Sequence, residues 1–321
     1  MNNWYYLLFF VILLALTRLY FYTARRYNIV DLPNHRTMHE GATIRGGGII
    51  ILAGILLFAI WTGFPSFYFL LGLVMIGLTG FLDDLKDLPG GARLIVQIIS
   101  MLLMVAELDM FGHNVVIIIL TVVIGAGILN AYNFMDGING ITGGYSMITV
   151  LSLMYVNLFI QPFIPNEFLL SFLISLVVFN IYNFRKNAVC FAGDVGSLSI
   201  AFIVIFLIFK LILESQQLIY LFFLTLYGID TIFTIVQRLA RKENIFEAHR
   251  LHLFQVAVRK TGLPHLMMSS IYMVVQLLVN IVVVFLATLI YADQMLYGGL
   301  LLLLASLVYV SLKSKMLSDL S

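Results

Sequence analysis

Long apolar runs alternate with short polar segments along the whole chain. A helix needs about 20 mainly apolar residues to cross a bilayer, and such runs can be located from hydropathy. The sequence predicts about eleven of them, with ends placed to within a few residues. They cover residues 4–24, 47–63, 66–82, 92–108, 115–132, 141–160, 167–182, 197–213, 217–236, 267–291 and 295–312. We therefore expect an all-α, polytopic integral membrane protein.

The composition supports the membrane class. Of the 321 residues, 62% are hydrophobic and 11% are charged, and the mean hydropathy is +1.04. A soluble domain has about 45–50% apolar and about 25% charged residues. No run of sequence suggests a soluble domain, so 1–321 is predicted to be one integral membrane domain. The first run lacks a basic leader and a small-residue cleavage site, so we expect a span and not a removable signal peptide.

The basic residues predict the orientation of the chain. All of the 18 Lys and Arg residues except Arg18 and Lys210 fall in alternate loops or in the C-terminal tail. Because Lys and Arg favour cytoplasmic loops, the N-terminus is expected outside and the C-terminus inside. The basic residues form no continuous patch, so nucleic acid is not an expected partner. The single Cys190 excludes an internal disulfide framework.

Five polar clusters fall on the predicted cytoplasmic side, in residues 31–49, 83–87, 130–144, 182–197 and 246–255. A transporter or flippase, the alternative class, would place polar residues near the bilayer midplane on broken helices. Only Arg18, Lys210 and Asp230 qualify as candidate midplane charges, and of these Asp230 is a functional candidate by default. The clustering therefore predicts an active site on the cytoplasmic face.

Three carboxylates close the third run in the sequence DDLKD. Asp83 and Asp87 would share a face if the helix continued, where like charges repel. A helix C-terminus is also unfavourable for anions. Mg²⁺, which binds carboxylates together with substrate phosphates, would remove both penalties. The alternative is a solvated turn neutralised by Lys86 and Arg93.

Two further clusters combine small residues with polar ones. In NAYNFMDGINGITGG, Asn133, Asp136 and Asn139 offer hydrogen-bonding groups to a nucleotide or sugar, although Asn, Asp and Gly are also ordinary turn residues. In FAGDVGS, Asp194 could bind a metal at a helix N-terminus, where phosphate is also favoured, or could simply be an N-cap. Phe191 could stack on a base.

The longest polar segment, 237–266, contains FEAHRLHLFQ. His249 and His252 would share a helical face and, with Arg250, could hold a phosphate. A zinc pair is the rival interpretation, but the HExxH spacing of zinc hydrolases is absent. Surface histidines without a function are the other alternative.

The order of these motifs is informative. PNHRTMHEGATIRGGG, DDLKD, NFMDGING, FAGDVGS and AHRLHLFQ follow one another between the predicted spans. In this order the chain resembles the polyprenyl-phosphate N-acetylhexosamine-1-phosphate transferases, the WecA/MraY-like glycosyltransferase family 4, over almost its whole length. The resemblance implies eleven spans and Mg²⁺, with Mn²⁺ as an alternative. A sugar 1-phosphate moves from a UDP-N-acetylhexosamine to undecaprenyl phosphate, and UMP leaves.

The resemblance also implies roles for residues that match the motifs. The catalytic candidates are Asp83, Asp84, Asp194 and His252. The metal candidates are Asp194 and Asn133. The substrate-binding candidates are His39, Arg45, Asn133, Asp136, Asn139, Asn183, Phe191, His249 and Arg250.

Two departures from the family pattern bear on the site and the substrate. Many members have a second Asp where this chain has Asn139, which argues against a direct acid or metal role for Asn139. The MraY branch carries consecutive histidines that AHRLHLFQ lacks, which argues against a muramyl-pentapeptide substrate. The WbpL-like branch, which begins O-antigen or capsule repeat units, is the nearer pattern, and a phospho-MurNAc-pentapeptide transferase is the alternative. A bacterial cytoplasmic membrane location follows from this resemblance, and a homodimer is compatible with it. Direct displacement is the expected mechanism, with a covalent phospho-sugar on an Asp as its rival.

Overall fold

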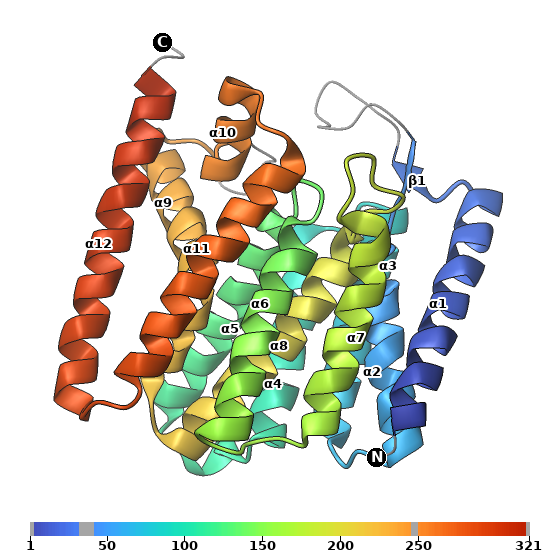
Figure 1. Ribbon diagram of the computed structural model, residues 1–321, viewed down its shortest axis with the longest axis horizontal. Helices are drawn as coiled ribbons and strands as arrows, with labels where there is room; N and C mark the ends of the chain where they lie inside the picture. Colours follow the sequence, from blue (N-terminus) through green and yellow to red (C-terminus); the bar gives the residue numbers. More distant parts are fainter. Residues whose placement is uncertain (1–2, 32–41, 245–249, 319–321) are drawn as a thin grey trace.

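The computed structural model describes residues 3–31, 42–244 and 250–318, and within them the chain is a bundle of roughly parallel long helices (Figure 1). The prediction of an all-α membrane protein is confirmed. The α-helices are α1 Asn3–Arg26, α2 Ile49–Thr62, α3 Phe67–Leu85, α4 Gly90–Glu107, α5 Val115–Met135, α6 Ile141–Phe159, α7 Asn166–Asn183, α8 Gly193–Ser215, α9 Thr225–Ala240, α10 Leu253–Thr261, α11 His265–Leu286 and α12 Tyr291–Ser318. Two 3₁₀ helices, η1 Met110–Gly112 and η2 Leu218–Leu224, and two strands, β1 Val30–Asp31 and β2 Thr43–Ile44, complete the elements.

The helices match the predicted spans closely. Ten helical segments in the described chain are long and apolar enough to cross a membrane, with η2 and α9 forming one of them. The remaining predicted run corresponds to α2, which is apolar but has only 14 residues. Helix α1 begins at one end of the bundle and α12 finishes at the opposite end, as Figure 1 shows. This arrangement is the one expected for an odd number of crossings.

Helix α8 lies at the centre of the bundle. In its most apolar 18-residue window, 89% of the residues are buried, and α2, α3, α5 and α6 all pack against it. A helix that is apolar on every side is stable only when other elements surround it. The start of α8 is therefore fixed in place, and so are the polar residues that lie there.

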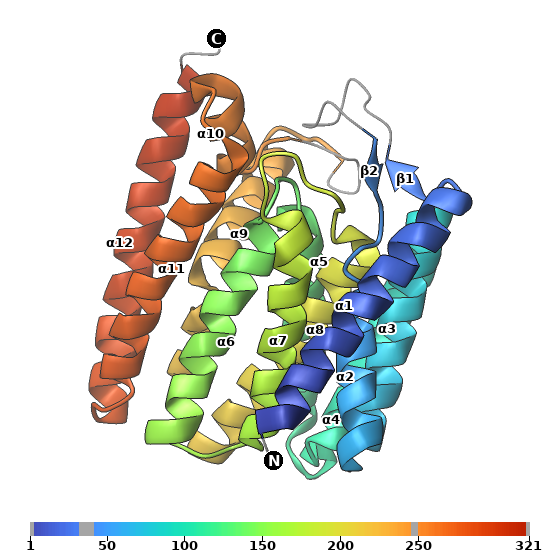
Figure 2. The ribbon, with the colours of Figure 1, turned by 45° about the vertical axis from the view of Figure 1, so that its right-hand side comes forward.

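Close backbone contacts gather the polar segments at the end of the bundle that carries the C-terminus. At Gly80 in α3, a Cβ would lie 2.6 Å from the backbone of Asp194, so only glycine allows this approach. Ile44 of β2 forms a parallel bridge with Cys190. Gly47 and Gly48 donate backbone hydrogen bonds to the carbonyls of Phe191 and Ala192, at 2.8 and 3.0 Å. Figure 2 shows the two strands beside the end of α1.

Candidate active site

The end of α3 and the start of α8 meet at the acidic pair of the DDLKD motif. Asp84 is buried, and its side chain is only 1% exposed. Its two carboxylate oxygens accept hydrogen bonds from the backbone N–H groups of Asp194, at 3.0 Å, and Val195, at 3.1 Å. These are first-turn donors of α8 that have no partner within the helix. Asp84 therefore caps α8 from another helix, and neither Asp194 nor Ser197 serves as its N-cap.

Asp83 faces a different set of groups. Its Oδ1 accepts a hydrogen bond from the backbone N–H of Leu88 at 2.6 Å, and its Oδ2 accepts one from Nη1 of Arg93 at 2.7 Å. The same Nη1 lies 3.7 Å from Oδ2 of Asp194. The carboxylates of Asp83 and Asp194 are also within hydrogen-bonding range of each other. Two facing carboxylates and one guanidinium thus form the chemical centre of this end of the bundle.

Asp87 does not join this centre. Helix α3 ends at Leu85 and Lys86 is extended, so Asp87 is exposed on the turn that follows. The expectation that Asp83 and Asp87 share one helical face is therefore wrong. The helix stops because Asp83 turns back to accept the hydrogen bond from Leu88.

The facing carboxylates suit a divalent cation. Two carboxylates so close together require a shared proton or a cation to offset their repulsion. The Asp194 side chain is 24% exposed, whereas Asp83 is 8% exposed, so the pair is open on one side. Within the described residues no three His, Cys, Asp or Glu side chains converge as a ready metal cage. Mg²⁺ fits such a donor set, because it commonly takes one or two carboxylates, waters and substrate phosphates.

The end of α5 supplies the next candidates. Oδ1 of Asn133 accepts a hydrogen bond from Oγ of Ser197 at 3.2 Å, which places this amide beside the start of α8. Asp136 follows the last residue of α5. Burial raises the pKa of Asp136 to about 7, and nearby Asp84 adds to the increase. Asp136 is therefore partly protonated near neutral pH in the absence of a cationic partner.

Two candidate amides hold loops together. Nδ2 of Asn139 donates to the carbonyls of Arg185 and Lys186, at 3.0 and 3.1 Å. Asn183 accepts from the Gly140 N–H at 2.8 Å and donates to the Cys190 carbonyl at 2.9 Å. Both side chains are buried. They join the loop after α5 to the loop after α7, and their contact with a substrate stays a prediction.

Arg45 and Phe191 lie on the neighbouring backbone. Nε of Arg45 is 3.5 Å from Oδ1 of Asp84, and its Nη1 donates to the Asp84 carbonyl at 3.2 Å. The Arg45 side chain is 43% exposed, so part of the guanidinium remains accessible to an anion. Phe191 is half-buried, and its N–H donates to the Ile44 carbonyl at 2.9 Å.

His252 is held by a buried carboxylate. Its Nδ1 lies 3.2 Å from Oδ1 of Asp230, and the Leu253 N–H donates to both Asp230 oxygens, at 3.0 and 3.2 Å. The hydroxyls of Tyr272 and Tyr309 also donate to Asp230, at 2.8 and 2.9 Å. The polar groups around Asp230 thus come from the start of α10, from α11 and from α12. Asp230 thus fixes the imidazole with Nδ1 toward the carboxylate and Nε2 away from it.

Contacts with the loop after α5 connect this histidine to the rest of the site. The ring of Phe134 at the end of α5 lies 6.4 Å from the His252 ring, measured between centroids. A Cβ at Gly137 would lie 3.0 Å from the Phe254 ring, so α10 begins directly against this loop. Ser269 of α11 donates to the Asn139 carbonyl at 2.8 Å.

The remaining candidates differ in how far the structure places them. Arg250 is half-buried, two residues before His252. His39 and His249 lie outside the described residues. The sequence suggests Arg93 only as a residue that neutralises the acidic turn, yet Arg93 contacts two of the catalytic candidates. The feature of the sequence that could have identified Arg93 as a site residue is its position at the start of the next helix, ten residues after Asp83.

Comparison with known proteins identifies relatives. The model of glycosyl transferase family 4 matches residues 66–212, from the residue before α3 into α8. This interval holds Asp83, Asp84 and Asp194 together with the loop after α5.

Individual relatives match over a longer part of the chain. A probable undecaprenyl-phosphate N-acetylglucosaminyl 1-phosphate transferase of Bacillus subtilis is 26% identical, covering 76% of this chain and 73% of the relative. An undecaprenyl-phosphate α-N-acetylglucosaminyl 1-phosphate transferase of Thermotoga maritima is 29% identical, covering 74% and 76%. A phospho-N-acetylmuramoyl-pentapeptide-transferase of Dictyoglomus turgidum is 26% identical, covering 68% and 76%.

Proposed function

Because residues 66–212 match the model of glycosyl transferase family 4 and the described helices are those of a multi-pass membrane protein, we propose that this chain is a phosphotransferase of that family, which transfers an N-acetylhexosamine 1-phosphate from a UDP-sugar to undecaprenyl phosphate. The products are undecaprenyl-diphospho-sugar and UMP. The observation that carries the proposal is the facing pair of Asp83 and Asp194 with Arg93 between them. Both substrates are phosphate anions, and a divalent cation held by this pair would give them a shared positive centre.

Asp83 and Asp194 would hold Mg²⁺, or Mn²⁺ in its place, and Asn133 lies close enough to the start of α8 to assist. When bound, the ion would neutralise the diphosphate of the donor and polarise the phosphorus under attack. Asp84 is already engaged with the α8 backbone, so its part is to position Asp194. Arg93 keeps the two carboxylates from repelling each other before the metal and substrate arrive.

The transfer itself is a displacement at phosphorus. An oxygen of the lipid phosphate forms a bond to the β-phosphorus of the UDP-sugar, and the bond from that phosphorus to the α-phosphate oxygen breaks. That oxygen leaves with UMP. The attacking oxygen is already anionic, so positioning and charge stabilisation supply most of the rate, as in other phosphoryl transfers. Arg45, Arg250 and His252 would bind the remaining phosphate charge.

The donor end of the site would hold the nucleotide. Phe191 would supply an aromatic face for uracil beside Gly47, whose N–H donates to the Phe191 carbonyl. Asp136 would bind donor hydroxyl or amide groups, while Asn139 and Asn183 hold the loops that shape this part of the site.

For the donor sugar we propose N-acetylglucosamine or a related N-acetylated sugar. Two of the relatives described above are named for N-acetylglucosaminyl 1-phosphate transfer, and the AHRLHLFQ motif lacks the consecutive histidines of the MraY branch. The reaction would start an O-antigen, capsule or other envelope glycan at the bacterial cytoplasmic membrane. Phospho-MurNAc-pentapeptide remains the alternative donor group, because one relative carries that name.

Release of UMP by the purified full chain tests this proposal. The reaction would contain undecaprenyl phosphate, UDP-GlcNAc and Mg²⁺, with samples that lack lipid or contain a chelator. We expect release to require all three components. Asp194→Asn should lower kcat by about 10²–10³-fold, the range seen when a charge-stabilising group is removed from an active site.

Asp87→Asn is the matched control, because Asp87 lies on the same turn but is exposed and outside the acidic pair. It should keep wild-type activity. Lipid-independent release, or equal losses in the two variants, would contradict the proposal. A panel of UDP-N-acetylated sugars then assigns the donor.

A further inference from the structure

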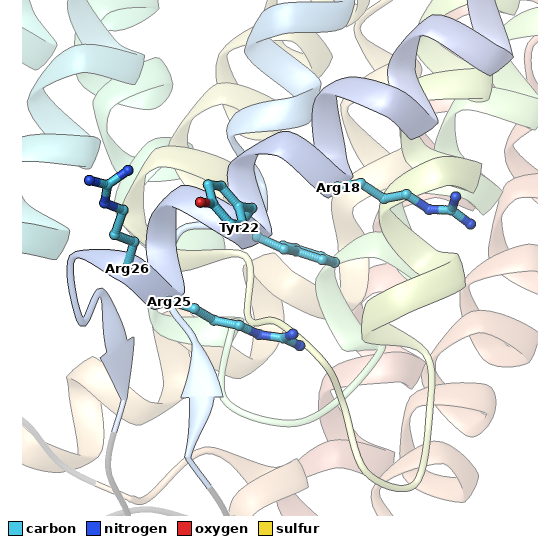
Figure 3. Close-up of a pocket in the computed structure, with 5 residues that line it drawn as sticks. Arg18, Tyr22, Arg25 and Arg26 are labelled. Atoms are coloured by element: carbon cyan, nitrogen blue, oxygen red, sulfur yellow. The ribbon is translucent and has the colours of Figure 1, made fainter.

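A groove of about 670 Å³ lies on the outside of the bundle, along α1. Its lining residues come from the last third of this helix. They are Arg18, Phe21, Tyr22, Arg25 and Arg26. In Figure 3 the side chains of Arg18 and Arg25 extend to the same side of α1, whereas that of Arg26 extends to the other side. The groove is separate from the acidic pair of α3 and α8.

No residue that the structure describes neutralises the positive charge in this groove. Helix α1 contains no acidic residue. Among the ion pairs of the described residues, none involves Arg18, Arg25 or Arg26. All three side chains are exposed.

Arg18 lies well inside the membrane-spanning part of α1, where an arginine without an acidic partner is energetically costly. Arg18 lies eight residues before the end of α1, about 12 Å along the helix at 1.5 Å per residue. Its neighbours Leu16 and Leu19 are exposed, as expected for a helix face in contact with lipid. An arginine on such a face is expensive unless it reaches water or an anionic partner. Its long side chain can direct the guanidinium toward the headgroup layer.

An aromatic side chain of the groove packs against the neighbouring helix. Phe21 packs edge-on against Tyr182 of α7, with ring centroids 4.9 Å apart. On the same tyrosine lies the guanidinium of Arg185, 5.9 Å from the ring centroid. The two packed rings therefore connect the groove to a third arginine, which lies outside its lining. Guanidinium groups bind phosphate oxygens in pairs of parallel hydrogen bonds.

We propose that this groove binds the phosphate headgroup of an anionic phospholipid of the surrounding bilayer, with Arg18 and Arg25 as its main ligands. The site goes beyond the proposed transferase reaction and does not depend on it. A bilayer phospholipid is the expected occupant because the groove opens on the lipid-facing side of α1 and contains an exposed tyrosine, a residue enriched at membrane interfaces. Clusters of basic residues at this level attract anionic lipids.

Lipid retention by the full-length protein tests the proposal. The protein would be purified in a neutral detergent, mixed with phosphatidylglycerol or phosphatidylcholine, and examined by native mass spectrometry and thermal unfolding. We expect phosphatidylglycerol to be retained and to raise Tm, and phosphatidylcholine to do neither. The double variant Arg18→Gln/Arg25→Gln should reduce retention at least tenfold. Arg259→Gln, which removes an exposed charge from α10, should behave as wild type.

Three further arms can overturn the proposal. Inorganic phosphate that raises Tm as much as phosphatidylglycerol would show a site for a free anion. Undecaprenyl phosphate that displaces phosphatidylglycerol at equal concentration would assign the groove to the acceptor substrate. Equal retention by the double variant and the wild type would show that the groove binds no lipid headgroup. Arg18→Lys/Arg25→Lys should retain an intermediate amount, because charge remains but the paired hydrogen bonds do not.

Discussion

Asp83 and Asp84 are neighbours in the chain, but they have different partners and therefore different roles. Asp84 uses both oxygens to hold the first turn of α8. Asp83 faces Asp194 and Arg93 instead. The sequence shows an acidic pair and cannot separate these roles, because the partners of Asp84 lie 110 and 111 residues away. The packing of α3 on α8 determines that Asp84 is used in hydrogen bonds to the backbone and that Asp83 remains available to bind a cation or substrate.

The buried contact between Asp230 and His252 predicts the effect of Asp230→Asn. An amide there no longer favours one ring orientation of His252, and it leaves a buried polar network incomplete. A buried hydrogen bond to a charged group is worth about 1.5–3 kcal/mol, so thermal unfolding should occur at a clearly lower temperature. In the fraction that stays folded, we expect kcat to fall with little change in KM for the UDP-sugar.

A control separates positioning from simple instability. Thr234→Val removes a neighbouring hydroxyl that donates to Asp230 at 3.2 Å but leaves the contact with His252. It should lower stability without a comparable fall in kcat. Wild-type kcat in Asp230→Asn would contradict the positioning role.

The raised pKa of Asp136 predicts that the free energy of unfolding depends on pH. Its pKa rises from an ordinary 3.8 to about 7 in the folded protein, chiefly by burial. Between about pH 4 and 7 the folded state therefore holds this proton more tightly than the unfolded state. Stability from this group then falls as the pH rises through that window. We expect Asp136→Asn to lose this fall, so that Tm of the variant minus Tm of the wild type grows from pH 4.5 to about 7 and is constant above. A gap that is the same at every pH would contradict this account.

At the scale of elements, the start of α8 depends on a glycine. Gly193 has φ +68°, and a Cβ at this position would collide with the carboxylate of Asp84. We expect Gly193→Ala to displace the first turn of α8 and to lower kcat at least tenfold, together with Tm. Gly127→Ala is the control, because a Cβ meets nothing within 4 Å there and alanine favours a helix by about 1 kcal/mol. Activity of Gly193→Ala equal to that of the control would argue against this dependence.

The helices that cross the bundle were the most predictable elements, because their apolar length alone identifies them. Helix α10, Leu253–Thr261, was not predicted, since it lies in a polar segment and only one side of it is buried. The predicted start of the eighth span at residue 197 was also late. Helix α8 begins at Gly193 because Asp84 supplies the acceptors for its first N–H groups, and this is a tertiary contact.

At the scale of the whole molecule, the orientation in the membrane can be tested with single cysteines. Cys190 is the only cysteine, and burial raises the pKa of its thiol to about 12, so it should not react. His113 and Lys86 are exposed at opposite ends of the bundle. A membrane-impermeant maleimide should label His113→Cys in intact cells and Lys86→Cys only after permeabilisation. The reverse pattern would contradict the orientation predicted from the basic residues.

The motifs predicted which segments meet, and the structure adds how they meet. Segments 42–49, 83–87, 130–144 and 182–197 lie together at one end of the bundle, as their polarity and common side suggested. The sequence did not predict that Arg93 contacts the acidic pair, nor that Asn139 and Asn183 hold two loops together. Each depends on which neighbour across the bundle supplies a donor or acceptor, and hydropathy carries no such information.

The central claim is that a sugar 1-phosphate, and not the sugar alone, moves to the lipid. The most direct measurement uses UDP-GlcNAc, or the donor assigned by the panel, labelled with ³²P in the β-phosphate or, separately, in the α-phosphate. After reaction with undecaprenyl phosphate and Mg²⁺, the β-label should be extracted with the lipid, whereas the α-label should stay in water as UMP. Recovery of the β-label in water as UDP, with the sugar on the lipid, would contradict the account.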